Sequence, residues 1–127
     1  MSNPVVRFRL DFAAGCSVGP GKIALLEHIE RAGSLSQAAR DLGMSYRRAW
    51  QLLSSLNASF REPVAATARG GRDGGGARLT RFGSELISLY RTFEEDTQAQ
   101  AVRVFKGIAG KARRRAPRTP VMRLSER

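Results

Sequence analysis

The chain has 127 residues, 42 % of them hydrophobic, and it carries 22 Lys and Arg against 11 Asp and Glu. This length predicts one domain whose core needs no metal, and the single cysteine excludes an intrachain disulfide, which is typical of a cytoplasmic protein. No apolar run predicts a membrane helix or a secretory signal. The net charge of +11 predicts an anionic partner, and nucleic acid is favoured over a membrane surface.

The N-terminal part of the sequence predicts a strand and then a helix. Apolar residues at positions 6, 8, 10 and 12 alternate with charged ones, which is the period of a half-buried strand. Residues 15–21 are rich in Gly and Pro and predict a loop. A helix is predicted over residues 20–32, ended by Gly33. No Cys/Asp/Glu cluster accompanies the only histidine, His28, which therefore predicts a partly exposed surface residue and no metal site.

Residues 34–60 predict two helices joined by a short turn. Ser34 and Gln37 have the spacing of an S-x-x-Q capping box at the start of the first helix. Gly43 ends that helix, and Ser45 can cap the second one. So short a link turns the chain sharply, as a helix-turn-helix requires.

The second of these helices, over residues 45–60, has two opposite faces. Apolar residues gather on one side, whereas the other side carries no carboxylate that phosphate would repel. Arginine can bind guanine O6 and N7 in the major groove, and glutamine can bind adenine N6 and N7. The predicted base contacts are Arg47, Arg48, Gln51 and Ser54, and the predicted backbone contacts near helix N-termini are Ser36, Gln37 and Tyr46.

Two features of this helix leave alternatives open. Trp50 is predicted to pack in the core or at its rim, beside Leu53, rather than to stack on bases. The polar face as a whole also fits an ordinary amphipathic helix whose polar side faces water.

A glycine loop between two short strands predicts a β-hairpin wing. Residues 63–69 and 77–79 are the predicted strands, and five of the seven residues from 70 to 76 are glycine. The loop matches no nucleotide-binding motif. Arg69, Arg72 and Arg78 are predicted to contact the DNA backbone or the adjacent minor groove. A solvated loop is the alternative.

A long helix is predicted from its cap, Thr80, to about residue 108. At about 1.5 Å per residue it is longer than a core of this size can cover, which predicts pairing with a second subunit; a frayed second half is the alternative. The predicted dimerisation residues are Leu86, Leu89, Phe93, Val102 and Phe105. Residues 106–127 hold eight basic residues and one acidic residue, so a DNA-binding domain is predicted over residues 1–108 and a basic, disordered tail over residues 109–127.

Two stretches carry a family resemblance. IALLEHIERAGSLSQAARDLGMSYRRAW, from residue 23, and ARGGRDGGGARLTRFGSELISLY, from residue 68, resemble the N-terminal domain of ModE-type molybdate-responsive regulators, which is similar in plan to the winged helix-turn-helix of LysR-type regulators. The resemblance covers about residues 5–104 and implies a dimer, formed through the last helix and the N-terminal region, that binds a palindromic operator. Full-length members of that family also carry two C-terminal molybdate-binding modules, which are not expected from this sequence, so no small-molecule effector is evident.

Together these features predict a mainly α winged helix-turn-helix with a small β-wing and a long C-terminal dimerisation helix. The predicted function is sequence-specific transcriptional regulation through double-stranded DNA, without a cofactor, and the resemblance adds molybdenum-related regulation. A non-specific nucleoid-type DNA-binding protein and a winged-helix protein-interaction module are the alternatives. An enzyme is not predicted, because no nucleophile–base set, paired carboxylates or metal cluster is visible.

Overall fold

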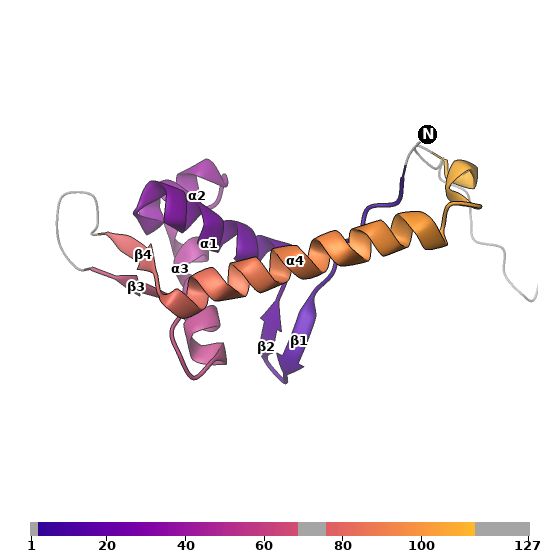
Figure 1. Cartoon of the computed structure of the whole chain (residues 1–127). Coiled ribbons are helices and arrows are strands. Elements are labelled where there is room, and N and C mark those ends of the chain that lie inside the picture. The colour runs from indigo at the N-terminus through magenta and orange to yellow at the C-terminus, as the bar shows by residue number, and fades with distance from the viewer. Residues whose placement is uncertain (1–2, 69–75, 114–127) are drawn as a thin grey trace, which may run out of the picture.

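The computed structural model describes residues 3–68 and 76–113. In this part of the chain two antiparallel hairpins flank three short helices, and a long fourth helix runs past them (Figure 1). The elements are β1 (Leu10–Ala13), β2 (Cys16–Val18), α1 (Pro20–Ala32), α2 (Leu35–Asp41), α3 (Tyr46–Ser59), β3 (Ala65–Thr67), β4 (Ala77–Leu79), α4 (Arg81–Val104) and the 3₁₀ turn η1 (Ala109–Lys111). The predicted mainly α winged helix-turn-helix is confirmed.

Helix α1 is the centre of the core and has the predicted bounds. It begins at Pro20, whose fixed φ suits the first helical turn, and ends at Gly33, whose φ of 73° is left-handed. The Gly33 N–H donates to the Ile29 carbonyl at 2.8 Å and closes the last turn. Its fully buried residues are Ile23, Leu25, Leu26 and Ile29.

The turn between α2 and α3 is built from caps at both ends. Ser34 Oγ accepts a hydrogen bond from the Gln37 backbone N–H at 3.1 Å, and Ser45 Oγ accepts one from the Arg48 backbone N–H at 3.1 Å. Gly43 has a φ of 69°, which allows the abrupt reversal. The predicted caps are confirmed, although the Gln37 side chain bonds within α2 and not back to the cap.

The N-terminal hairpin differs from the prediction in two ways. Cys16–Val18 form strand β2, not a loop, because Gly15 makes a tight turn at φ 76° and Val18 is fully buried against the core. A register shift between Asp11 and Ala13 then interrupts the alternation of β1. As a result Phe12 is 55 % exposed, so the prediction that it shares a half-buried face was wrong.

The residues before β1 lie along α4 instead of pairing in a sheet (Figure 1). Val6 N–H donates to Gln98 Oε1 at 2.8 Å, and Gln98 Nε2 donates to the Pro4 carbonyl at 2.7 Å. The buried Tyr90 stacks on Phe8 and donates its hydroxyl proton to the Phe8 carbonyl at 3.0 Å, and burial raises the pKa of Tyr90. The N-terminal segment therefore covers part of the second half of α4.

Helix α4 meets the domain through a glycine and ends earlier than predicted. A Cβ at Gly83 would lie 2.0 Å from the Val64 carbonyl oxygen, so only glycine fits this approach. Thr80 caps the helix as predicted, and its Oγ1 accepts from the Gly83 N–H at 3.0 Å. The helix stops at Val104, four residues before the predicted end. Gly107 and Gly110 follow, and glycine is a poor helix former.

An ion pair joins α1 to α4. Arg91 contacts Glu27 at 2.6 Å and Glu94 at 2.6 Å. The hydrogen bond from Arg91 lowers the pKa of Glu27, and the two carboxylates raise the pKa of Arg91. Since both partners keep part of their surface in water, the pair positions α4 more than it stabilises the fold.

None of the helices in the described ranges combines the length and the apolar content that a membrane crossing needs.

Candidate nucleic-acid interface

Helix α3 presents one polar face outward. Ala49, Leu53 and Leu56 are buried, which fixes the rotation of the helix. Arg47, Arg48 and Gln51 are exposed, and Ser54 is half-buried. The structure thus brings three of the four predicted base contacts onto one open face and places Ser54 nearer the domain. No residue of α3 is acidic.

The predicted backbone contacts near α2 and α3 are less uniform. Tyr46, in the first turn of α3, is 51 % exposed. Gln37 is half-buried, and its side chain accepts from Arg40 at 2.8 Å and donates to Asp41 at 2.7 Å. Ser36 is also half-buried in the first turn of α2. Tyr46 is therefore the most accessible of these residues.

Trp50 departs most clearly from its prediction. Its side chain is 53 % exposed, so the expectation of a core or core-rim residue was wrong. The reason lies in the width of the buried face. At 100° per residue, positions 49, 53 and 56 span roughly 60° of the helix, and Trp50 lies roughly 60° beyond Leu53. The core therefore covers a narrower arc of α3 than the positions of its apolar residues suggest.

Lys22 is a basic residue of this surface that the sequence reasoning missed. Its Nζ donates to the Ser17 carbonyl at 2.8 Å and reaches Ser55 Oγ of α3 at 3.5 Å. The ammonium group therefore stands beside the polar face of α3. A positive charge in the first turn of α1 is unfavourable beside the positive end of the helix dipole. This unfavourable position of Lys22 was the sequence signal that could have revealed it.

The wing is tied to the helix-turn-helix at two points. Strands β3 and β4 pair antiparallel, with Ala66 opposite Arg78. The Ala77 N–H donates to the Gly33 carbonyl at 2.9 Å, which joins the wing to the turn between α1 and α2. Asn57 of α3 accepts from the Val64 N–H at 2.7 Å and donates to the Ala65 carbonyl at 3.2 Å. Asn57 is a positioning residue that the sequence reasoning also missed.

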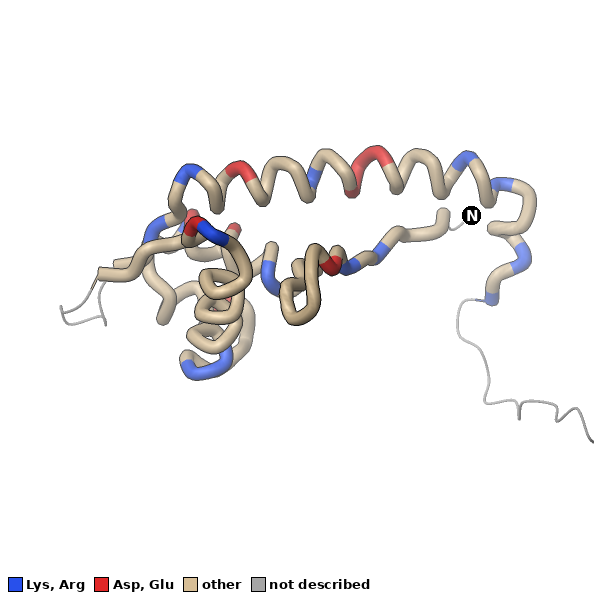
Figure 2. Tube along the Cα trace, turned by 90° about the horizontal axis from the view of Figure 1, so that it is seen from below, with Lys and Arg blue, Asp and Glu red and all other residues tan. Residues whose placement is uncertain are grey.

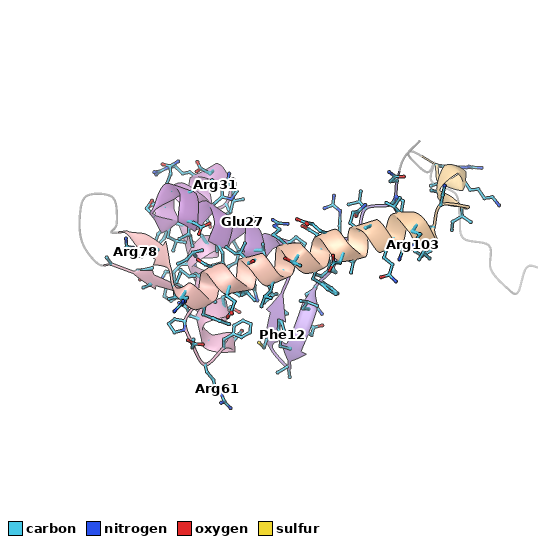
Figure 3. All side chains as sticks on the ribbon, viewed as in Figure 1. Phe12, Glu27, Arg31, Arg61, Arg78 and Arg103 are labelled. Atoms are coloured by element: carbon cyan, nitrogen blue, oxygen red, sulfur yellow. The ribbon has the colours of Figure 1, made fainter. Side chains whose placement is uncertain are left out.

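Arg78 is exposed on the wing, as its predicted role requires, and Figure 3 shows it beside the wing strands. The predicted contacts Arg69 and Arg72 lie outside the described residues. The longest acidic stretch in the described chain, residues 94–96, lies in the middle of α4 (Figure 2). Carboxylates are thus concentrated on α4, while α3 has none.

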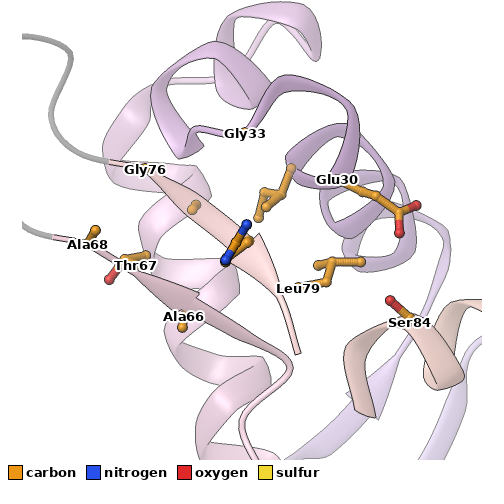
Figure 4. A pocket seen from close by; sticks show the side chains of 11 residues that line it. Glu30, Gly33, Ala66, Thr67, Ala68, Gly76, Leu79 and Ser84 are labelled. Carbon is orange, nitrogen blue, oxygen red and sulfur yellow. The ribbon is translucent and has the colours of Figure 1, made fainter. Parts of the chain in front are cut away.

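A pocket of about 680 Å³ opens between the wing and α1 (Figure 4). Glu30 and Arg78 supply its charged groups, Thr67 and Ser84 supply its hydroxyl groups, and alanine and glycine line much of the rest. Within the described ranges no three His, Cys, Asp or Glu side chains gather as metal ligands. The pocket lies beneath the wing strands, on the side of α1.

The predicted dimerisation residues divide into covered and uncovered ones. Leu86 is only 7 % exposed and belongs to the core, and Val102 is half-buried. Leu89 is 63 % exposed, and Phe93 and Phe105 are also exposed. Leu89 lies between the buried residues Leu86 and Tyr90 in the sequence but points away from the core, whereas Phe105 follows the end of α4.

The sequence is similar to those of three named proteins. The chain is 37 % identical over 95 residues to the molybdenum transport protein ModE of Azotobacter vinelandii. These residues make up 75 % of this chain and 35 % of that protein. It is 46 % identical over 71 residues to the DNA-binding transcriptional dual regulator ModE of Escherichia coli K12, over 56 % of this chain and 27 % of that protein. It is 40 % identical over 90 residues to the molybdenum-pterin-binding protein MopA of Rhodobacter capsulatus, over 71 % of this chain and 34 % of that protein.

The matched part lies at the helix-turn-helix. These identities confirm the predicted resemblance to ModE-type regulators. The chain spans about a third of the length of these relatives. The family profile of bacterial regulatory helix-turn-helix proteins matches residues 21–84, which run from α1 through the wing into α4. With its caps, its exposed helix α3 and its wing, this chain belongs to the lysR family of bacterial regulatory helix-turn-helix proteins.

Proposed function

We propose that this protein is a sequence-specific transcriptional regulator that binds double-stranded DNA through the outward face of α3. The observation that carries the proposal is the exposed, carboxylate-free face, with Arg47 and Gln51 opposite the buried face and Arg48 beside them. An α-helix fits the major groove, where these side chains can reach base edges. Arg78 and Tyr46, which are both exposed, are the proposed phosphate contacts.

The named relatives support the same direction. The relative from Escherichia coli is described as a DNA-binding transcriptional dual regulator, and the relatives from Azotobacter vinelandii and Rhodobacter capsulatus carry molybdenum in their names. We therefore propose genes of molybdenum metabolism as the regulated targets.

A homodimer and a palindromic operator are part of the proposal. At 100° per residue Leu89, Phe93 and Val104 fall within roughly 60° on one side of α4. These three residues form the exposed stripe of α4, and each is exposed in the single chain. Exposed apolar surface of this kind marks an interface, and two copies related by a two-fold axis would bind a symmetric site.

Selection of bound duplexes from a random pool tests the proposal. We expect a two-fold symmetric consensus whose half-sites are about one helical turn apart. Binding should also weaken steeply as salt rises. Equal affinity for all duplexes would instead establish a non-specific nucleoid-type protein, and no binding at low salt would favour a protein-interaction module.

A further inference from the structure

The most exposed large aromatic side chain near the polar face of α3 is Trp50. It is 53 % exposed, although tryptophan is usually well covered in folded proteins. Within the described residues no hydrogen bond or ring contact engages the indole. Trp50 therefore contributes little to the packing of its own domain.

The position of Trp50 is defined by its neighbours on the helix. At 100° per residue it lies roughly 60° from Arg47 and roughly 40° from Ser54 on the outward side. It lies only roughly 20° from Asn57, whose amide holds the base of the wing. The indole thus stands at the edge of the polar face of α3, on the side of the wing.

We infer that Trp50 is a specificity-determining residue that packs its indole against the C5-methyl group of a thymine in the major groove. The inference rests on the proposed function. The thymine methyl is the apolar group that base pairs present in the major groove, and an uncharged aromatic surface is suited to contact it. Stacking on a base within the duplex is excluded for a side chain on a groove-bound helix, because the bases there remain stacked on one another.

Replacement of thymine by deoxyuridine removes only this methyl group and so tests the contact directly. In the selected operator, each thymine of one half-site is replaced in turn. We expect one replacement to weaken binding by the wild-type protein about fourfold, the effect of one buried methyl group. Trp50→Ala removes the contact from both half-sites of the proposed dimer, so it should bind the unmodified operator about sixteenfold more weakly than the wild type, and it should not respond to that replacement.

Arg47→Ala is the matched control, because it should bind more weakly yet keep the response to deoxyuridine. Trp50 is the sole tryptophan, so its emission should shift to the blue on operator binding without any substitution. The inference is overturned if the wild type ignores every replacement, if Trp50→Ala keeps the wild-type response, or if Trp50→Ala weakens all duplexes equally. A protein that selects a symmetric site but ignores the methyl group keeps the proposed function, whereas a protein that selects no site loses both.

Discussion

The outward face of α3 and the exposed stripe of α4 differ in both charge and support. The face on α3 carries arginines and no carboxylate, and the caps and Asn57 hold it in place. The stripe on α4 is apolar, and residues 94–96 beside it are acidic. Phosphate would be repelled there and attracted to α3. One small core therefore supports two separate surfaces, a basic one on α3 and an apolar one on α4.

Gly83→Ala should be the most damaging substitution, because it disturbs the junction between α4 and the rest of the domain. The new Cβ would fall 2.0 Å from the Val64 carbonyl oxygen, so α4 or the segment before the wing must shift. We expect a loss of about 3 kcal/mol in the free energy of unfolding, measured by urea titration. Gly107→Ala is the control, because a Cβ there meets no atom within 4 Å. Equal stability of the two variants would contradict the close approach.

Arg47→Ala separates the two surfaces by removing a charge from α3 alone. We expect a loss of about 1–3 kcal/mol in binding to the selected operator, together with relaxed preference at one base pair. The control is Arg103→Ala, which removes an exposed arginine at the far end of α4 (Figure 3). Binding measured by fluorescence anisotropy should change little in that control. If both variants bind the operator with the same affinity, α3 is not the recognition helix.

Leu89→Asp tests the other surface. A charge at the N-terminal end of the exposed stripe should weaken association of two copies at least about tenfold, or roughly 1.4 kcal/mol, as measured by sedimentation. Affinity for a single half-site should stay the same, because α3 is untouched. Ser88→Asp adds the same charge at the neighbouring exposed position. An unchanged dimer in Leu89→Asp would remove the stripe from the interface.

The smallest effect is expected from Glu27→Gln, which loosens the link between the two surfaces. Both members of the ion pair with Arg91 are partly exposed, so the loss at pH 7 should be about 0.5–1 kcal/mol. Because hydrogen bonding lowers the folded pKa of Glu27 below its usual 4.5, this stabilisation is present above that pH and disappears as the pH falls through the lowered value.

Urea titrations at pH 7 and near pH 3 measure the change. The gap between wild type and Glu27→Gln should narrow at the lower pH. Glu95→Gln, at an exposed position of α4, should show no such gap at either pH.

Local sequence signals were enough for the parts of the fold that depend on caps and glycines. Pro20 and Gly33 set the ends of α1, and Ser34, Ser45 and Thr80 cap the helices that follow, all as predicted. These features depend on a few residues close together in the chain, so a single sequence reveals them.

Features that depend on distant contacts were not predictable in the same way. Trp50 is exposed because of how narrow an arc α3 buries, which depends on its neighbours and not on its own pattern. Asn57 and Lys22 acquire their roles from partners seven or more residues away, at Val64 and Ser55. Strand β2 forms in a stretch that reads as a loop, because Val18 is needed in the core.

The side-chain amide of Asn57 donates one hydrogen bond and accepts another, and both constrain how α3 and the wing strands would meet the proposed operator. Because Asn57 joins Val64 and Ala65 to the last turn of α3, and the Gly33 carbonyl joins Ala77 to the turn before α2, hydrogen bonds hold β3 and β4 in place beside the helices. In the proposed complex, the protein therefore sets the distance along the duplex between the bases at α3 and the backbone at Arg78, so it would recognise the spacing of a site as well as its base sequence.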